Sequence, residues 1–283
     1  MMNLVKASLI FVLFLPLVIS PPHQVKGVAG IATCDHLAGV GATAWYNWSP
    51  SGGPDCPGRI PMIRDAEQVA GLQDGTLQIP PGANLILGFN EPDLDPPPGS
   101  ALTPEEAVPL WRWVEETYPD HRLVSPAPSP NDIYWLLRFR NAYRAEYGEW
   151  PRFDYLGAHC YFYRVGNYDS TFVCKGILRM FIAWADEWEI EGGVLLTEFA
   201  AGAIDSSTSD GFDYDSAVFA ANNFLAWLLE PEQDRIMGWF WFSAHDWGVW
   251  PANVTTALYD DEENLTPLGE VYRDFSIPEE PEW

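Results

Sequence analysis

The sequence predicts an α/β fold, a single-domain (β/α)8 TIM barrel with one glutamate at the end of its fourth strand and another on its seventh. Apolar runs of strand length alternate eight times with helical or helix-length segments. Two of these runs end in a lone carboxylate, Glu91 and Glu198. The chain has 283 residues, and without a leader its length approaches the roughly 250 typical of this barrel.

The eight expected strands are apolar or β-rich runs bounded by turn residues. In order they are residues 26–30, 42–48, 60–63, 84–89, 122–127, 153–162, 193–200 and 236–243. The first has the weakest pattern, whereas the second ends in aromatic side chains before a Ser-Pro-Ser-Gly-Gly-Pro cluster. In the fourth and sixth runs the polar or aromatic residues lie at the C-terminal end. In TIM barrels the active site is at this end of the strands.

Helical patterns separate most of these strands. Thr103, Pro104 and Glu106 form a capping-box signature that begins one helix, and Pro109 is expected to kink it. The other expected helices are near 66–72, 129–143, 176–191 and 214–229, with a short one within 257–274.

The N-terminal segment is expected to be a leader. Lys6 precedes the apolar stretch 9–19, which is too short for the roughly 20 residues that span a bilayer. Residues 1–25 are therefore interpreted as a signal peptide, with a retained membrane anchor as the alternative, and the protein as secreted, with cell-wall or membrane association left open. The domain is expected over residues 26–275, followed by an acidic tail over 276–283.

The composition favours a neutral partner. A net charge of −25 repels nucleic acid and anionic polymers, although an acidic or saline habitat explains such a charge equally well. With 47% hydrophobic residues the chain can bury one large core, and we expect a monomer that needs no cofactor.

The four cysteines suit an oxidising compartment. We expect the pairs Cys34 with Cys56 and Cys160 with Cys174, because each closes a short loop near the end of an expected strand. The alternative is a metal site built from Cys34, His36, His159 and Cys160. Because these residues lack the usual zinc-ligand spacing, no metal is expected.

The chemistry is predicted from the two glutamates. About three strand-helix units fit between Glu91 and Glu198, so both carboxylates can face one barrel mouth. Two carboxylates about 5 to 5.5 Å apart cleave a glycosidic bond with retention, one protonating the leaving oxygen and the other attacking the anomeric carbon. The alternative for Glu91 is a turn or capping carboxylate after a core strand.

Other side chains near the expected strand ends suit sugar binding. Asn90 and Asn47 are candidates for hydroxyl contacts, and His159 is a candidate either for such contacts or for orienting Glu198. The aromatic candidates for a platform under the sugar rings are Trp45, Tyr161, Trp239 and Trp241. The alternative for the aromatic residues and for His159 is packing in the core.

Five motifs together resemble the catalytic domain of glycoside hydrolase family 128, over about Lys26 to Tyr272. They are Gly88-Phe89-Asn90-Glu91-Pro92-Asp93, Trp45-Tyr46-Asn47-Trp48, Ser125-Pro126-Ala127, Thr197-Glu198-Phe199 and Leu265-Thr266-Pro267-Leu268-Gly269. The resemblance implies a (β/α)8 barrel that hydrolyses β-1,3-glucan with retention, with Glu91 as acid/base and Glu198 as nucleophile; we expect endo action. The alternatives are a glucan-binding wall protein without turnover, or the same mechanism on mannan or galactan.

Overall fold

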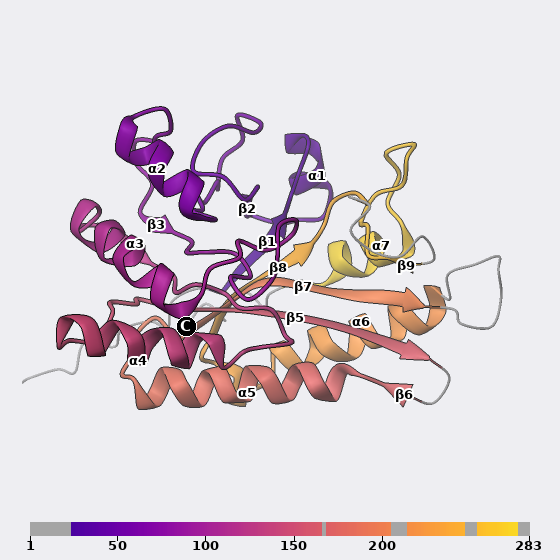
Figure 1. Cartoon of the computed structure of the whole chain (residues 1–283). Coiled ribbons are helices and arrows are strands. Elements are labelled where there is room, and N and C mark those ends of the chain that lie inside the picture. Colours follow the sequence, from indigo (N-terminus) through magenta and orange to yellow (C-terminus); the bar gives the residue numbers. More distant parts are fainter. Residues whose placement is uncertain (1–23, 166–167, 205–213, 247–253, 277–283) are drawn as a thin grey trace, which may run out of the picture.

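The computed structural model describes residues 24–165, 168–204, 214–246 and 254–276 (Figure 1). The strands are β1 (Val25–Ala29), β2 (Ala44–Tyr46), β3 (Leu85–Ile86), β4 (Arg122–Leu123), β5 (Leu156–Val165), β6 (Tyr168–Asp169), β7 (Val194–Ile204), β8 (Ile236–Phe242) and β9 (Val254–Thr255). The helices are α1 (Cys34–Gly39), α2 (Ala66–Asp74), α3 (Pro104–Thr117), α4 (Trp135–Tyr147), α5 (Thr171–Glu187), α6 (Tyr214–Leu228) and α7 (Pro267–Asp274), with a 3-10 turn over Pro231–Gln233.

The central sheet is mostly parallel. Its order is β2-β1-β8-β7-β5, with β6 antiparallel on β5 and β9 antiparallel on β7, while β3 and β4 form a separate parallel pair. The first strand therefore pairs with the last long one, Gly27 opposite Phe240. An α/β fold with a mostly parallel sheet is thus confirmed.

The expected strand 60–63 is not a regular strand. Single parallel β-bridges join this segment to the strands on either side, Arg59 with Trp45 and Met62 with Leu87. Pro61 explains the interruption, because it has no amide hydrogen to donate, although its carbonyl accepts from the Leu87 amide at 2.9 Å. β3 and β4 are also shorter than the runs that predicted them.

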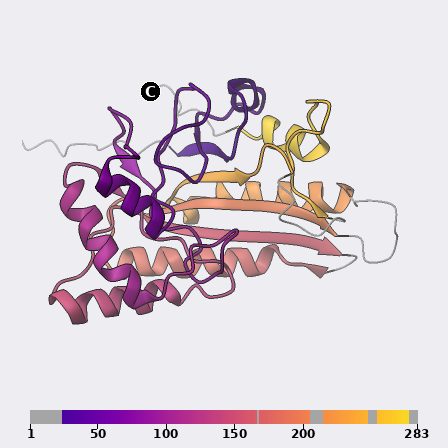
Figure 2. The ribbon, with the colours of Figure 1, turned by 45° about the horizontal axis from the view of Figure 1, so that its top comes forward.

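Helices cover the outer face of the sheet and a second, smaller core fills its inner face. α5 and α6 pack along β5 and β7, which run side by side beyond the other strands (Figures 1 and 2). The outer core joins strand residues to helix residues such as Trp111, Phe181 and Phe224. The buried residues of the inner core all belong to strands or their bridging segments: Ala29, Ala44, Tyr46, Met62, Leu87, Val124, Leu195, Met237, Phe240 and Phe242.

The expected cap of α3 is confirmed, and so is the position of Pro109 within that helix. The Thr103 hydroxyl accepts from the Glu106 amide at 3.2 Å while the Glu106 carboxylate accepts from the Thr103 amide at 2.9 Å, which is the expected capping box. Pro109 lies inside α3.

Both expected disulfides are also present. Cys34–Cys56 and Cys160–Cys174 each have a Cα–Cα distance of 5.5 Å, and the second joins β5 to α5.

The leader and the tail fall largely outside the described residues, which begin at Gln24 and end at Ser276. Within the described segments, no helix is both long enough and apolar enough to cross a membrane.

Candidate active site

Glu91, which follows β3, and Glu198, which lies within β7, come together in the structure. Together with His159 they form a cluster in which one carboxylate oxygen of each glutamate and one imidazole nitrogen lie within 4.8 Å of one another. Glu91 is 4% exposed and Glu198 is 3% exposed, so both are held in protein rather than in bulk water. The two glutamates, 107 positions apart in the sequence, thus share one small volume.

The backbone around Glu91 is fixed from both sides. Its amide donates to the Ala127 carbonyl at 2.9 Å, and its own carbonyl accepts from the Leu94 amide at 3.0 Å. Glu91 has a φ of 38°, in the left-handed region that a residue with a side chain seldom adopts. Strained conformations of this kind persist where the surroundings over-determine them, as these hydrogen bonds do.

Glu198 is presented by an irregularity within β7. The pairing of β7 with β8 shifts register between Leu196 and Phe199, and β5 shifts just before His159, which lies opposite Glu198. Such irregularities re-aim side chains at the ends of strands. The result places Glu198 on the inner face of the sheet while Phe199 packs in the outer core.

Three donors converge on the Glu198 carboxylate. The Trp48 indole N–H donates to Oε1 at 2.7 Å. The single proton of the Tyr46 hydroxyl is shared between the Thr197 carbonyl at 2.8 Å and the same Oε1 at 3.1 Å. The Tyr161 hydroxyl donates to Oε2. These N–H and O–H groups occupy three of the roughly four lone-pair sites of the carboxylate. The arrangement therefore suits a hydrogen-bonded carboxylate better than a metal ligand.

Burial sets the protonation behaviour of this group. Desolvation raises the pKa of Glu198 and the nearby charge of Glu91 adds to the rise, while His159 and the hydrogen bonds from Tyr161 and Trp48 oppose it. Burial and the charge of Glu198 raise the pKa values of both Tyr46 and Tyr161 well above that of a free tyrosine. Both hydroxyls therefore keep their protons and remain donors.

His159 lies behind the two glutamates. Its Nδ1 is 3.1 Å from Glu91 Oε1 and 3.7 Å from Glu198 Oε2, and its side chain is fully buried. Burial lowers the pKa of His159, but the charges of Glu198, Glu91 and Asp93 outweigh burial and leave it raised. The position favours orientation of the carboxylates and not direct contact with a sugar hydroxyl.

A cavity of about 560 Å³ opens over the pair, a size typical of small-ligand sites. It is lined by Asn47, Trp48, Arg64, Asn90, Glu91, Leu94, Pro97, Pro98, Ser129, Pro130, Asn131, Tyr161, Glu198 and Phe242. Three expected binding residues, Asn47, Asn90 and Tyr161, are thus brought to the site. The buried Asn90 Oδ1 has no hydrogen-bond partner among the described residues, which leaves an acceptor beside Glu91.

Three expected platform residues are instead in the outer core. Trp45, Trp239 and Trp241 are completely buried and do not line the cavity. The Trp45 indole donates to the Pro57 carbonyl at 3.2 Å and the Trp241 indole donates to the Thr256 carbonyl at 2.7 Å. Successive residues of a strand point to opposite faces, so their neighbours Tyr46 and Phe242 occupy the inner face.

The aromatic residues that do reach the cavity were partly missed. Trp48 follows β2 with a φ of 53°, a left-handed backbone conformation that its sequence context does not reveal. Phe242 lies one position after Trp241, so it points to the opposite face of the strand. Strand alternation would have predicted Phe242 at the cavity if the inner face had been known.

We expect Trp241→Phe to lower stability without changing substrate affinity. The substitution leaves unfilled volume and an unpaired buried carbonyl at Thr256, at a cost of about 2 kcal/mol in the free energy of unfolding. Urea unfolding measures the loss, and KM measures affinity. A raised KM with unchanged stability would indicate instead that Trp241 contacts the substrate.

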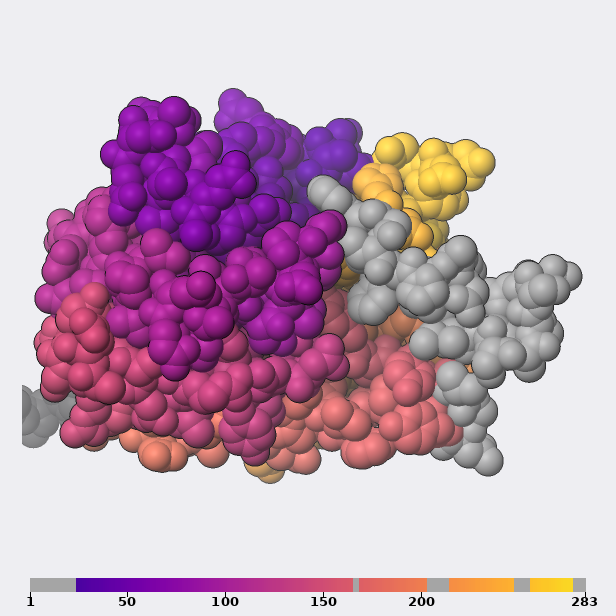
Figure 3. Space-filling model, in the orientation of Figure 1, coloured from indigo at the N-terminus to yellow at the C-terminus, as the bar shows by residue number. Residues whose placement is uncertain are grey.

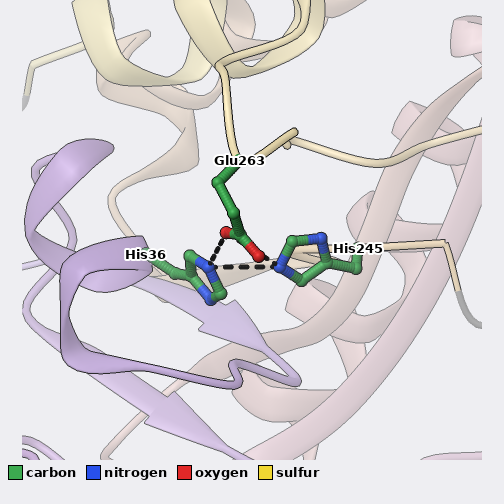
Figure 4. Close-up of side chains that lie close together, drawn as sticks. All are labelled: His36, His245 and Glu263. Carbon is green, nitrogen blue, oxygen red and sulfur yellow. Dashed lines mark hydrogen bonds and ion pairs between the residues drawn. The ribbon is translucent and has the colours of Figure 1, made fainter. Parts of the chain in front are cut away.

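A second cluster of chelating side chains lies away from this cavity lining. His36 Nε2 is 2.6 Å from Glu263 Oε2 and 3.1 Å from His245 Nε2 (Figure 4). The opposite ring nitrogen of His36 accepts from the backbone amides of Ala32 and Thr33, both at 3.3 Å, as part of the cap of α1.

The cap fixes the tautomer of His36. With Nδ1 as acceptor the proton lies on Nε2, where it is donated to Glu263 and lowers the pKa of that carboxyl. A metal would need a lone pair at this same nitrogen, and a ligating histidine normally donates from its other nitrogen. The cluster therefore joins α1 to the segments before α7 and after β8 by hydrogen bonds.

Comparison with known families identifies one family over most of the chain. The family model described as "Glycosyl hydrolase catalytic core" matches residues 30–272. Comparison with curated proteins gives no match.

Several solved structures are similar over most of the chain. A subgroup II GH128 endo-β-1,3-glucanase from Sorangium cellulosum has 23% identity and a TM-score of 0.66, with 89% of this chain and 98% of that chain covered. A subgroup I enzyme from Amycolatopsis mediterranei in complex with laminaritriose has 22% identity and a TM-score of 0.64, with coverages of 89% and 100%. A subgroup V exo-β-1,3-glucanase from Cryptococcus neoformans has 26% identity and a TM-score of 0.64, with coverages of 88% and 98%.

These matches confirm the resemblance to glycoside hydrolase family 128 that the five sequence motifs indicated. The family model covers far more than half of the sequence and includes both glutamates. The chain therefore belongs to the glycosyl hydrolase catalytic core family.

Proposed function

We propose that the protein is a retaining, endo-acting β-1,3-glucan hydrolase. The observation that carries the mechanism is the approach of the Glu91 and Glu198 carboxylates within 4.8 Å beneath an open cavity. This spacing leaves no room for a water between carboxylate and anomeric carbon and suits direct attack.

In the first step Glu198 attacks the anomeric carbon. The glycosidic C–O bond breaks as Glu91 gives its proton to the departing oxygen, and a glycosyl ester on Glu198 remains. Glu91 then takes a proton from an incoming water whose oxygen replaces Glu198 at the anomeric carbon. Tyr46, Trp48 and Tyr161 hold Glu198 in place for attack. The side-chain oxygen of Asn90, Oδ1, is available to accept from a ring hydroxyl.

The substrate assignment draws on the relatives. Solved GH128 relatives are described as endo- or exo-β-1,3-glucanases, and one is in complex with laminaritriose. From these relatives we propose β-1,3-glucan as the substrate of this chain. We further propose that the chain cleaves it internally. The acidity of the chain agrees with a neutral polysaccharide.

We also propose that the sheet closes into an eight-stranded barrel, with Glu91 after the fourth strand and Glu198 on the seventh. Support comes from the bridges that link β2, the segment 59–62, β3, β4 and β5 in turn. Two disulfides support a secreted protein, and we propose that it acts as a monomer without a metal.

Hydrolysis of laminarin followed by proton NMR tests the function. We expect the β-anomer to appear first, and products of mixed lengths early in the reaction if action is endo. Initial α-anomer would overturn retention. Binding without release of reducing sugar would favour a non-catalytic glucan-binding protein. Cleavage of mannan or galactan, but not of laminarin, would show that the substrate is one of those polysaccharides.

We expect Tyr161→Phe to shift the acidic limb of the pH profile of kcat. Glu198 must be ionised to attack, and loss of a hydrogen bond that lowers its pKa raises that pKa further. Activity should then fall at a pH about one unit higher, since a hydrogen bond to a charged group contributes roughly 1.5–3 kcal/mol. Tyr155→Phe serves as control, because the Tyr155 hydroxyl bonds to Arg122 and not to Glu198. An unmoved limb in Tyr161→Phe would contradict the assignment.

A further inference from the structure

An exposed aromatic surface continues outward from the catalytic cavity along β5. It consists of Tyr163, Tyr168 and Phe172, which are 37%, 48% and 61% exposed, and we call it the aromatic ridge. Large aromatic side chains at this level of exposure are unusual when they adjoin one another, and such patches mark binding surfaces.

Strand geometry places the ridge on the same face as the active site. His159 contacts Glu91 and Tyr161 contacts Glu198, and Tyr163 follows Tyr161 by two positions on β5. Alternate residues of a strand share a face and advance about 6.6 Å per pair. Tyr163 therefore continues the line of side chains that begins at the catalytic glutamates.

The β5–β6 hairpin adds the second ring to this face. Tyr168 pairs in register with Val165, which is again two positions beyond Tyr163. The ring centroids of Tyr163 and Tyr168 are 5.8 Å apart, and those of Tyr168 and Phe172 are 6.1 Å apart. The three rings are thus contiguous and extend from β5 through β6 to the first turn of α5.

The ridge is anchored to the body of the protein. The Ser170 hydroxyl accepts from the Tyr163 amide at 2.8 Å and donates to the Tyr163 carbonyl at 3.0 Å. The Cys160–Cys174 disulfide ties β5 to α5 beside it. In Figure 3 the salmon surface that contains this region lies across a hollow from the magenta loops. A preorganised surface of this kind costs little conformational entropy on binding.

We propose that the aromatic ridge binds the part of a β-1,3-glucan chain that extends beyond the cavity. This inference rests on the proposed function, because it extends the same site. A cavity of about 560 Å³ encloses a short oligosaccharide, so a polymer that is cut internally must leave it over the adjoining surface. The apolar C–H faces of the sugar rings pack on aromatic rings, and a neutral chain avoids the repulsion that this acidic protein exerts on anions.

The test compares long and short substrates on the double variant Tyr168→Ala/Phe172→Ala. With soluble laminarin we expect KM to rise about tenfold and kcat to stay within about twofold, because the lost contacts bind ground state and transition state equally. With laminaritriose, which is too short to reach the ridge, kcat/KM should stay unchanged. The matched control is Tyr147→Ala, with 37% exposure at the far end of α4.

A catalysis-independent measurement separates the two proposals. In gels that contain laminarin, the Glu198→Gln protein should be retarded and the same protein with the ridge removed should be retarded less. An unchanged KM for laminarin, or an equal loss of kcat/KM on laminaritriose, would refute glucan binding by the aromatic ridge. Neither result would contradict the proposed hydrolase function. If wild-type protein cleaves no β-1,3-glucan, the proposed function fails instead. A change from dimer to monomer in size-exclusion chromatography of the variant would assign the ridge to self-association.

Discussion

Glu198→Gln is expected to abolish hydrolysis of laminarin while leaving the fold intact. The amide is a poor nucleophile, so no glycosyl ester forms, and we expect kcat to fall by at least about 10³-fold. The folded state should tolerate the change, because a buried carboxyl whose pKa is raised by desolvation gives way to a neutral group of the same shape. Release of reducing sugar measures the activity, and thermal unfolding measures the fold.

A matched control separates this effect from the general loss of a glutamate. Glu116→Gln makes the same chemical change at a side chain that is 62% exposed and paired with Arg112. We expect that variant to keep full activity, because exposed ion pairs contribute little. Residual activity of Glu198→Gln within tenfold of wild type would refute the assignment of the nucleophile.

Glu91→Ala is expected to give a second and different pattern. Without the acid/base, kcat on laminarin should fall by roughly 10²- to 10⁴-fold. A substrate with a good leaving group, such as a nitrophenyl β-glycoside of laminaribiose, needs no proton to depart, so its first step should be much less affected. The glycosyl ester on Glu198 should then accumulate, since no base activates water.

Added azide provides the diagnostic measurement. As an anion that needs no base, azide should attack the ester, restore turnover of the activated substrate and release a β-glycosyl azide. Glu198→Gln forms no ester and should show no such rescue, which makes it the control. Equal loss on natural and activated substrates, with no rescue, would show that Glu91 does not act as acid/base.

The pair of candidate catalytic glutamates was predictable because its signal is local. Each glutamate ends or interrupts an apolar strand run, and a carboxylate is too costly to bury there without a purpose or a partner. The disulfide pairs were predictable for a similar reason, because short loops limit which cysteines can meet.

The donors around Glu198 were harder to predict. Trp48 reaches it through a left-handed backbone turn, and Tyr46 reaches it from a strand whose inner face is defined by the whole sheet. His159 was a candidate, but its contact with Glu91 depends on a register shift in β5. None of these features has a signature within a few residues of sequence.

The sequence by itself determined most of the long strands and helices, the cap of α3, the two disulfides and the two glutamates, because each depends on neighbouring residues or on short loops. The tertiary structure alone decided which face of each strand is the inner one. That choice placed Trp45, Trp239 and Trp241 in the outer core and gave the cavity to Trp48 and Phe242. The physical reason is the two-residue period of a strand: a single register shift exchanges its faces, and only packing against distant strands and helices fixes the register.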